Sequence, residues 1–454
     1  MSWQSPQTWK TATLADICYR IVDGSHNPPT GQPSGKPMLS AKNIQNGKIH
    51  FDGLRLLSTD DFELENNRTN ISAGDVLLTI VGAIGRTAVV PATAPEFTLQ
   101  RSVAVLKSNL MNPNYLRYLL DSPAAQSFFL NNAKGTAQKG IYLKALGGMQ
   151  IPIAPPAEQA RIAQKLDELL AQVDTLKCRV DSIPALLKRF RQSVLAAAVS
   201  GRLTEDWRHA QAVDPEWKKT AIKSVCSVAF DGPFGSKLKS DDYTSEGVRV
   251  VRLENIGHMG FISEKETFIS PAKFKELAKN KLEPGDILFS SFVDEEIRVC
   301  QLPKSEETFI NKADCFCLRI DQTVAKPKFL LYSLAARQTY RQIREAVHGA
   351  TRPRINLGFL KVFEISLPST TEQIEIIQRV EQLFAFVSQL EVRVKVAQAR
   401  IDGLTQSILA KAFRGELVPQ DPNDEPASVL LDRIKAQHAA APKGKRGRRS
   451  ATAD

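Results

Sequence analysis

Two stretches of the sequence place apolar residues at alternating spacings of four and three, which is the pattern of a coiled-coil seam. Every member of the second series follows its counterpart in the first by 214 residues. The pattern predicts two helices of about 40 residues, each roughly 60 Å long, which pair through their seams as an antiparallel coiled coil. A helix packed on a globular core is the alternative. The two series are Ile162, Leu166, Leu169, Val173, Leu176, Val180, Ile183, Leu187, Phe190 and Val194, then Ile376, Val380, Leu383, Val387, Leu390, Val394, Ala397, Ile401, Leu404 and Ile408.

Proline and glycine residues mark the interruptions and ends of these helices. Pro184 lies inside the first stretch. Because proline lacks the amide donor and clashes with the preceding turn, we expect a kink or a short break there. Gln398 occupies the equivalent position, so the second helix should be straighter. Gly201 and Gly415 follow the two stretches and are natural helix stops.

The repeat continues into the rest of the chain. Glu158-Gln159 matches Glu372-Gln373 at the same offset of 214, whereas Trp9 matches Trp217 at an offset of 208. The offset therefore drifts through the first two-thirds of each half and is constant over the helices. The sequence predicts two related scaffolds with divergent surfaces.

Short β-branched runs and two helical patterns precede each long helix. "GDVLLTIV" and "RSVAVLKS" read as strands, and residues 112–130 and 326–347 read as helices. We expect a mixed α/β (α+β) domain of about 150 residues, present in two copies. The predicted segments are residues 1–155, a first globular domain; 156–202, the first helix; 203–367, a second globular domain; 368–416, the second helix; and 417–454, a basic tail that we expect to be disordered.

The composition is that of a soluble globular protein with an excess of positive charge. Hydrophobic residues make up 43% and charged residues 24%, and the net charge is +11. Apolar runs are too short for a membrane span, so we expect a cytoplasmic protein without a membrane partner. The charge suggests a polyanion partner. Cys315 and Cys317 alternate within a strand pattern, a spacing that favours a structural role over a zinc site.

Catalytic motifs are incomplete. Asn27-Pro28-Pro29 is most of the motif that amine-methylating DNA methyltransferases use at a flipped base, but Thr30 stands where that motif needs an aromatic ring. Too few residues precede it for a Gly-rich loop that binds the methyl donor. "GPFGSK" (232–237) lacks the spacing of a P-loop, and the six histidines show no metal-ligand spacing. We therefore expect no catalytic residues, no metal site and no cofactor bound by this chain.

The duplicated layout resembles the specificity subunits of type I restriction–modification systems. The resemblance rests on "PPAEQARI" with "TEQIEII", on "RQSVLAAAVSGRL" with "QSILAKAFRGEL", on "GDVLLTIVGAIGR" and on the two tryptophan-led starts, and it covers residues 3–420. It implies a non-catalytic subunit whose two target recognition domains each read one half of an asymmetric, bipartite site in double-stranded DNA. The helices would set the spacer and dock two methyltransferase subunits.

The resemblance also implies what the partners contribute. The methyltransferase subunits would use S-adenosylmethionine to methylate adenine, and motor–nuclease subunits with ATP and Mg would restrict unmodified DNA in a prokaryotic cytoplasm. Two other functions remain open on the residues alone: a coiled-coil adaptor whose α/β domains bind proteins, and an enzyme with an unrecognised site. DNA binding should weaken steeply with salt, and adaptor binding should not.

Candidate DNA-binding residues carry donors, acceptors or positive charge in loops or at strand ends. The two basic, glycine-containing loops at 134–142 and 348–356 are the best supported, because they occupy equivalent places in the repeat. For His26, a role in capping a turn explains the residue as well as a contact with a base does. The candidates are Ser25, His26, Asn27, Lys36, Lys42, Asn43, Arg86, Arg101, Lys134, Gln138 and Lys139 in the first domain, and Ser236, Lys237, Lys239, Arg252, Glu254, Asn255, Arg298, Arg352 and Arg354 in the second.

Overall fold

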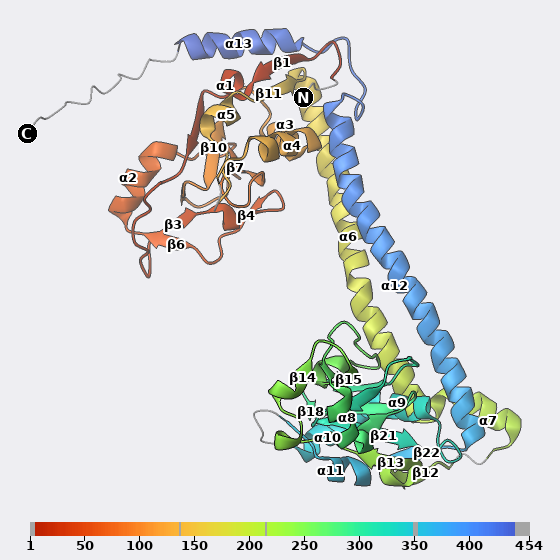
Figure 1. The fold of residues 1–454 in the computed structure, drawn as a ribbon. Helices are drawn as coiled ribbons and strands as arrows, with labels where there is room; N and C mark the ends of the chain where they lie inside the picture. The colour runs from red at the N-terminus through yellow and green to blue at the C-terminus, as the bar shows by residue number, and fades with distance from the viewer. Residues whose placement is uncertain (1–4, 136–137, 214–215, 348–352, 441–454) are drawn as a thin grey trace, which may run out of the picture. The chain divides into compact units, whose positions relative to one another are not determined.

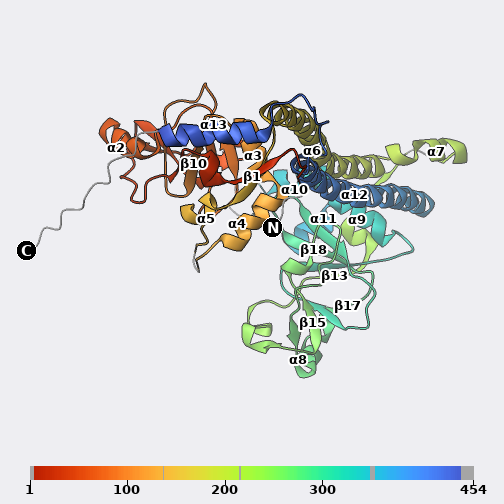
Figure 2. The same cartoon turned by 90° about the horizontal axis from the view of Figure 1, so that it is seen from above.

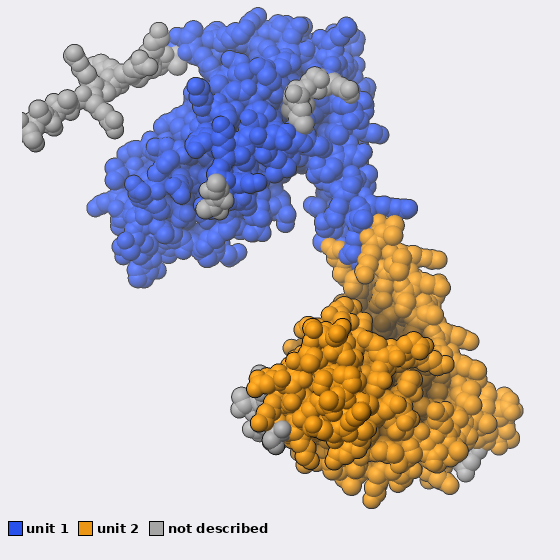
Figure 3. Space-filling view, in the orientation of Figure 1, with its two compact units in different colours: residues 1–180, 397–454 blue, residues 181–396 orange. Residues whose placement is uncertain are grey.

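The computed structural model describes residues 5–135, 138–213, 216–347 and 353–440. The chain forms two compact units, which Figure 3 distinguishes by colour. Unit 1 comprises residues 1–180 and 397–454, and unit 2 comprises residues 181–396. Each unit is mixed α/β, as the sequence predicts, and contains part of each long helix.

Unit 1 contains a four-stranded sheet in the order β2-β10-β7-β8, with antiparallel pairs throughout. Its strands β7 and β10 are labelled in Figure 1. Three smaller sheets accompany it, in the orders β1-β11, β6-β3-β9 and β4-β5. The strands are β1 (Lys10–Thr13), β2 (Arg20–Asp23), β3 (Lys36–Leu39), β4 (Ile44–Gln45), β5 (Lys48–Ile49), β6 (Arg55–Leu57), β7 (Val76–Thr79), β8 (Thr87–Val89), β9 (Thr98–Leu99), β10 (Val103–Lys107) and β11 (Gln150–Ile153). The helices are α1 (Leu14–Ile17), η1 (Ala41–Asn43), α2 (Thr59–Thr69), α3 (Pro113–Asp121), α4 (Pro123–Asn132), α5 (Leu143–Gly147) and α13 (Ala427–Ala440).

Unit 2 repeats this arrangement with a four-stranded sheet in the order β13-β21-β18-β19 and the pair β12-β22. Its second large sheet has the order β14-β16-β15-β20-β17. The strands β15 and β17 of this sheet are labelled in Figure 2. The strands are β12 (Lys218–Ala221), β13 (Cys226–Phe230), β14 (Tyr243–Thr244), β15 (Val248–Val251), β16 (Phe268–Ile269), β17 (Lys281–Leu282), β18 (Ile287–Val293), β19 (Ile297–Gln301), β20 (Phe309–Asn311), β21 (Cys315–Ile320) and β22 (Glu364–Leu367). The helices are η2 (Arg202–Thr204), α7 (Glu205–Gln211), η3 (Ile222–Val225), η4 (Gly235–Lys237), η5 (Ser240–Asp242), η6 (Leu253–Asn255), α8 (Pro271–Glu276), η7 (Ala278–Asn280), α9 (Pro327–Ala335), α10 (Arg337–Ala346) and α11 (Leu357–Val362).

The central strands are buried on both faces because successive side chains point to opposite sides. In β7, Val76 and Leu78 join the core that includes the helices, whereas Leu77 joins a second core against the smaller sheet. In unit 2, Phe316 faces the helices while Cys315 and Cys317 face the other way. Both cysteines are buried free thiols, which fits the structural role expected for them.

The two long helices are α6 (Pro156–Val199) and α12 (Thr370–Phe413), each of 44 residues. Both end before a glycine with positive φ, +79° at Gly201 and +75° at Gly415, so the predicted stops are confirmed. The expected break at Pro184 is wrong, because α6 continues through it. The helix loses one amide donor there but keeps the packing of flanking seam residues such as Leu187, which is 8% exposed.

The segment after α12 corrects one expectation of the sequence analysis. Residues 417–440 are not disordered: α13 lies against α1 and buries Ala427, Leu430 and Ile434 in the core of unit 1 (Figure 1). The charge of the last residues masked the apolar positions ahead of them. The run at 442–450 lies outside the described residues. Within the described ranges, the helices are too short or too polar to cross a membrane.

Candidate nucleic-acid interface

An Asp-Gly pair begins a loop after the equivalent strand of each unit. Gly24 follows β2 and lies so close to β9 that a Cβ would stand 2.0 Å from the carbonyl oxygen of Leu99. Gly232 follows β13, and its Cβ would stand 2.1 Å from the carbonyl carbon of Lys312. Only glycine allows this approach of two backbones. The recurrence of the pair after 208 residues is a sequence signal that our candidate list missed.

Main-chain hydrogen bonds gather several loops at this place in unit 1. The amide of Arg101 donates to the carbonyl of Ser25 at 2.8 Å, and that of Ile80 donates to Ser102 at 2.9 Å. The amide of Gly82 donates to Lys139 at 3.1 Å. We call the resulting surface edge 1, made of residues 23–27, 40–43, 80–86, 100–102 and 138–141.

Unit 2 builds the same surface from different residues. The amide of Ser291 donates to Asp314 at 2.9 Å, that of Ile355 donates to Ser291 at 2.9 Å, and that of Val293 donates to Pro353 at 3.0 Å. We call this surface edge 2, made of residues 231–232, 252–255, 291–298, 312–314 and 353–355. The described parts of the two basic loops therefore join equivalent edges.

Most candidate residues of unit 1 are exposed. Lys36 is not one of the residues of edge 1; it forms an ion pair with Glu96, and its Nζ lies 4.7 Å from the ring centroid of Phe62. Ser25 lies in edge 1 but is buried, at 5% exposure. Lys134 lies next to edge 1, because its backbone exchanges two 2.8 Å hydrogen bonds with Gly140. The exposed candidates are His26, Asn27, Lys42, Arg86, Arg101, Lys134, Gln138 and Lys139.

His26 is oriented by a charged cluster. Its Nε2 lies 2.8 Å from Oδ2 of Asp23, which also pairs with Arg68. The carboxylate favours a proton on Nε2, which leaves Nδ1 as an acceptor in the neutral ring. The exposed imidazole can therefore meet a hydrogen-bond donor at edge 1. Our candidate list contained His26 but missed the aspartate that holds it.

The arginines of edge 2 are each paired with an acid. Arg252 lies 3.3 Å from Glu254, Arg298 lies 3.9 Å from Asp294, and Arg354 lies 2.5 Å from Asp314. Lys237 and Lys239 are exposed on the loop that follows Gly232. The side chain of Ser236 and the whole of Arg352 lie outside the described residues.

Asn43 and Asn255 hold equivalent loops together from inside. They are 2% and 1% exposed. The side-chain amide of Asn43 donates to the carbonyls of His50 and Asp52, both at 3.1 Å. That of Asn255 donates to Ile262 and Lys265. Because the side-chain oxygens also accept a backbone amide three residues earlier, we assign both residues a structural role.

Edge 2 also contains residues that sequence reasoning missed. Lys312 donates to the hydroxyl of Tyr243 at 2.5 Å and lies 5.0 Å from the centroid of its ring. Asp231 accepts the amides of Gly232 at 2.7 Å and Asp314 at 3.0 Å. Burial raises the pKa of Asp231 despite these bonds. Lys312 occupies the position in the second half of the repeat that Gln100 occupies in the first, and this equivalence was the sequence signal for it.

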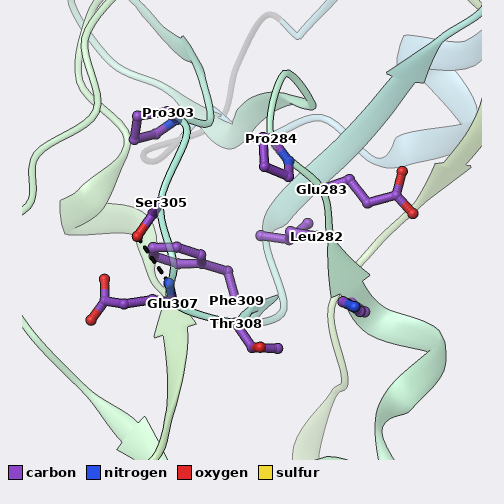
Figure 4. A pocket seen from close by; sticks show the side chains of 9 residues that line it. Leu282, Glu283, Pro284, Pro303, Ser305, Glu307, Thr308 and Phe309 are labelled. Carbon is purple, nitrogen blue, oxygen red and sulfur yellow. Dashed lines mark hydrogen bonds between the residues drawn. The ribbon is translucent and has the colours of Figure 1, made fainter.

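A small pocket lies elsewhere in unit 2 (Figure 4). It has a volume of about 210 Å³ and is lined by residues including Leu282, Pro303 and Phe309. The amide of Glu307 donates to Ser305 beside it (Figure 4). Phe309 begins β20, whereas Lys312 follows its end, so the pocket does not belong to edge 2. Within the described ranges, His, Cys, Asp and Glu side chains form no group suited to a metal ion.

The two edges carry the kinds of group that contact nucleic acids. Exposed cations suit phosphates, and oriented donors and acceptors suit base edges in a groove. The backbone frame is shared, but the side chains differ between the edges.

Comparison with known proteins identifies relatives of this chain. A family described as the type I restriction modification DNA specificity domain matches residues 6–184 and 215–396. The chain is 31% identical over 424 residues to the type I restriction enzyme EcoKI specificity subunit of Escherichia coli K12, covering 89% of each chain. It is 32% identical over 469 aligned residues to the StySPI specificity subunit of Salmonella potsdam, covering 98% of this chain and 99% of that one.

Solved structures share the fold. The HsdS subunit from Thermoanaerobacter tengcongensis matches with a TM-score of 0.55 and 20% identity, covering 91% of this chain and 98% of that chain. A chain from a structure of the type I R-M system, described in terms of complex assembly and conformational transition, matches with a TM-score of 0.62 and 19% identity. It covers 91% of this chain and 100% of that chain.

Proposed function

Since the chain belongs to the family of type I restriction–modification specificity subunits, we propose that it reads a split, asymmetric DNA site through edges 1 and 2. The observation that carries the proposal is the construction of one edge twice, on the same backbone frame and with different side chains. Each unit would read one half-site. The half-sites would differ because His26 and Arg101 serve edge 1, while Arg252 and Arg354 serve edge 2.

Edge 1 has the features of a phosphate-binding surface. Arg86, Arg101 and Lys139 are exposed, and within the described residues no acidic side chain pairs with them. Unpaired cations attract phosphate more strongly than cations that already hold a carboxylate. These three residues would position DNA, and neighbouring loop residues would contact its bases.

The long helices would form the antiparallel coiled coil and set the spacer. Within unit 1, Lys177 of α6 pairs with Asp402 of α12 at 2.6 Å. Within unit 2, Arg191 of α6 pairs with Glu391 of α12 at 3.0 Å. Of the twenty predicted seam residues, only Leu176, Phe190 and Leu404 are exposed, so the seams are largely packed.

Exposed apolar residues on these helices support docking of methyltransferase subunits. In unit 2, Leu186 is 56% exposed, Phe386 55% and Val392 62%. A contiguous exposed apolar patch is typical of a surface that a partner covers, and these three side chains would contribute to such patches. The chain itself would be non-catalytic. S-adenosylmethionine, ATP and Mg²⁺ would act in the methyltransferase and motor–nuclease partners.

A methylation map tests the proposal directly. The chain is co-expressed with the methyltransferase subunit of its own system, and modified adenines are sequenced across the host genome. We expect a split, asymmetric motif with a fixed gap. Methylation without a sequence preference, or its absence in an assembled complex, would contradict the proposal and favour a protein adaptor.

A further inference from the structure

We propose that Arg354 reads a guanine in the half-site of unit 2, with Asp314 holding its side chain in position. The inference rests on the proposed function and specifies one base contact of edge 2. Arg354 is chosen because its backbone pairs with β18 and its guanidinium pairs with Asp314, so that both ends of the residue are held in place.

The backbone of Arg354 is anchored to the end of β18. A β-bridge joins Arg354 to Phe292, and the neighbouring amides of Val293 and Ile355 complete the hydrogen bonds on either side. The guanidinium carbon lies 5.7 Å from the centroid of the Phe292 ring. An aromatic face beside the arginine limits the directions that its side chain can take.

The guanidinium is held by an aspartate that is itself fixed. Nη2 of Arg354 lies 2.5 Å from Oδ1 of Asp314. The same Oδ1 accepts the hydroxyl of Ser291 at 2.9 Å, and the amide of Asp314 donates to Asp231 at 3.0 Å. Asp314 has a left-handed backbone with φ +70°, a conformation that persists only where surrounding bonds enforce it.

The remaining donors of Arg354 are available for a base. The side chain is 49% exposed. Within the described ranges, the Arg354 side chain forms an ion pair with Asp314 through Nη2, and its Nη1 and Nε donate no hydrogen bond to the protein. Nη2 carries two hydrogens, so one remains beside Nη1. Two parallel N–H groups match O6 and N7 of guanine in the major groove.

Charge favours a base over a phosphate as the target. Arg354 stands beside two carboxylates, Asp314 and Asp231, and both lower its attraction for an anion. The guanidinium keeps its planar arrangement of N–H donors in this pairing, but the neighbouring carboxylates neutralise its positive charge. Arg298 is a weaker candidate, because it is 29% exposed and its Nη1 already donates to Leu253 at 3.1 Å.

The test is a methylation map of the assembled methyltransferase with four variants. We expect Arg354→Ala and Arg354→Lys to relax one guanine in one half-site, with discrimination falling about tenfold to a hundredfold. Asp314→Asn should relax the same position to a smaller extent, because asparagine tolerates the left-handed backbone but does not hold the cation. Arg341→Ala removes an exposed arginine of the same unit and should leave the motif unchanged.

Two results would separate this inference from the proposed function. In the first, the wild-type complex methylates a split motif and the Arg354→Lys complex still requires every guanine of that motif. This result would overturn the role of Arg354 and leave the proposed function standing. A wild-type complex that methylates without a split motif would overturn both. Arg354→Lys keeps the charge and length of the side chain, so it decides the matter if the alanine variant fails to assemble.

Salt dependence gives an independent readout. Binding of the complex to its own site is measured across salt concentrations for wild type, Arg354→Ala and Arg101→Ala. We expect Arg354→Ala to weaken binding without changing the slope against salt, and Arg101→Ala to reduce the slope by about one. An equal loss of slope in Arg354→Ala would make Arg354 a phosphate contact and overturn the inference.

Discussion

The indole nitrogen of Trp9 donates a 3.0 Å hydrogen bond to Oε2 of Glu158 and ties the first segment of unit 1 to the start of α6. Trp217 repeats this bond with Glu372 in unit 2, at 3.1 Å. The two bonds explain why both tryptophans and both glutamates recur in the sequence. They fix where each globular fold meets its long helix.

The surroundings of the two carboxylates differ. Oε1 of Glu372 accepts the hydroxyl of Thr204 at 2.7 Å and also a bond from Arg208. Oε1 of Glu158 is buried and, within the described residues, has no hydrogen-bond partner. The positions equivalent to Thr204 and Arg208, 214 residues later, are the apolar Val418 and Pro422. Burial accordingly raises the pKa of Glu158.

Glu372→Gln should therefore destabilise unit 2 more than Glu158→Gln destabilises unit 1. The first change leaves Arg208 without its anion and should cost about 1.5–3 kcal/mol. Glu158→Gln removes a buried charge whose Oε1 has no hydrogen-bond partner within the described residues, so it should change the stability by less than about 1 kcal/mol. Denaturant unfolding of both variants measures the difference. Equal losses would show that the second oxygen of Glu372 contributes nothing.

The repeat explains how much of the fold the sequence predicts. The helices were readable because seam residues such as Ile162 and Ile376 keep a fixed spacing and a fixed offset over many turns. The continuation of α6 through Pro184 could not be predicted in this way. The pattern shows that one amide donor is missing, but it does not show the packing that offsets this loss. Leu430 and Ile434 of α13 share a spacing of four, but the segment is too short for periodicity to outweigh the charged run behind it.

The exposure of the candidate binding residues was harder to predict, for a physical reason. A polar side chain in a loop can face solvent or satisfy the loop's own backbone, and Arg101 and Asn43 give the same sequence signal. The structure exposes Arg101 and buries Asn43. Asp23 and Asp314 were missed because an acid that orients a neighbouring side chain leaves no spacing pattern in the sequence. Their contacts with His26 and Arg354 give them the role of orienting a donor or acceptor.

Asp121 should make the stability of unit 1 depend on pH. Burial raises the pKa of its carboxyl from 3.8 to about 6, although Thr87 donates to it at 2.6 Å. The folded state then binds the proton more tightly than the unfolded state. The resulting stabilisation is complete below the ordinary pKa and is lost as pH rises through about 6.

The expected loss is at most about 3 kcal/mol. Asp121→Asn should flatten the dependence of the unfolding free energy on pH between the ordinary pKa of 3.8 and the raised pKa of about 6. Ala335 stands at the equivalent position of unit 2, so the effect belongs to unit 1. Denaturant unfolding at a series of pH values measures it. A curve for Asp121→Asn that runs parallel to wild type would rule out this carboxyl as the source.

Gly24 and Gly232 should each be required for the edge of their own unit. Alanine at either place brings Cβ within 2.1 Å of the opposing backbone, which must move. We expect Gly24→Ala to destabilise unit 1 and Gly232→Ala unit 2, by about 2–4 kcal/mol. Unfolding and binding to single half-sites measure the two effects.

Gly260→Ala is the matched control, because nothing lies within 4 Å of its added Cβ. It should leave both stability and half-site binding at wild-type values. Should Gly24→Ala bind its half-site as well as Gly260→Ala does, the close approach of the two backbones would be unnecessary for edge 1.

The helix α13 should contribute to the stability of unit 1. Ile434 is 2% exposed and packs into the core that also contains α1, whereas Val429 on the same helix is 39% exposed. Truncation of a buried isoleucine leaves a cavity, so Ile434→Ala should cost about 2–4 kcal/mol. Val429→Ala loses less contact and should cost well under half of that amount. Thermal unfolding measures both, at roughly 2–4 °C per kcal/mol.

Two truncations separate the helix from the basic run behind it. Removal of residues 427–454 takes away Leu430 and Ile434 and should lower the melting temperature of unit 1 at least as far as Ile434→Ala does. Removal of residues 441–454 alone keeps both side chains and should leave the melting temperature unchanged. The shorter truncation also deletes five basic residues, so any loss of DNA affinity without a loss of stability would assign those cations to phosphate binding. Equal melting temperatures for both truncations would mean that unit 1 folds independently of α13.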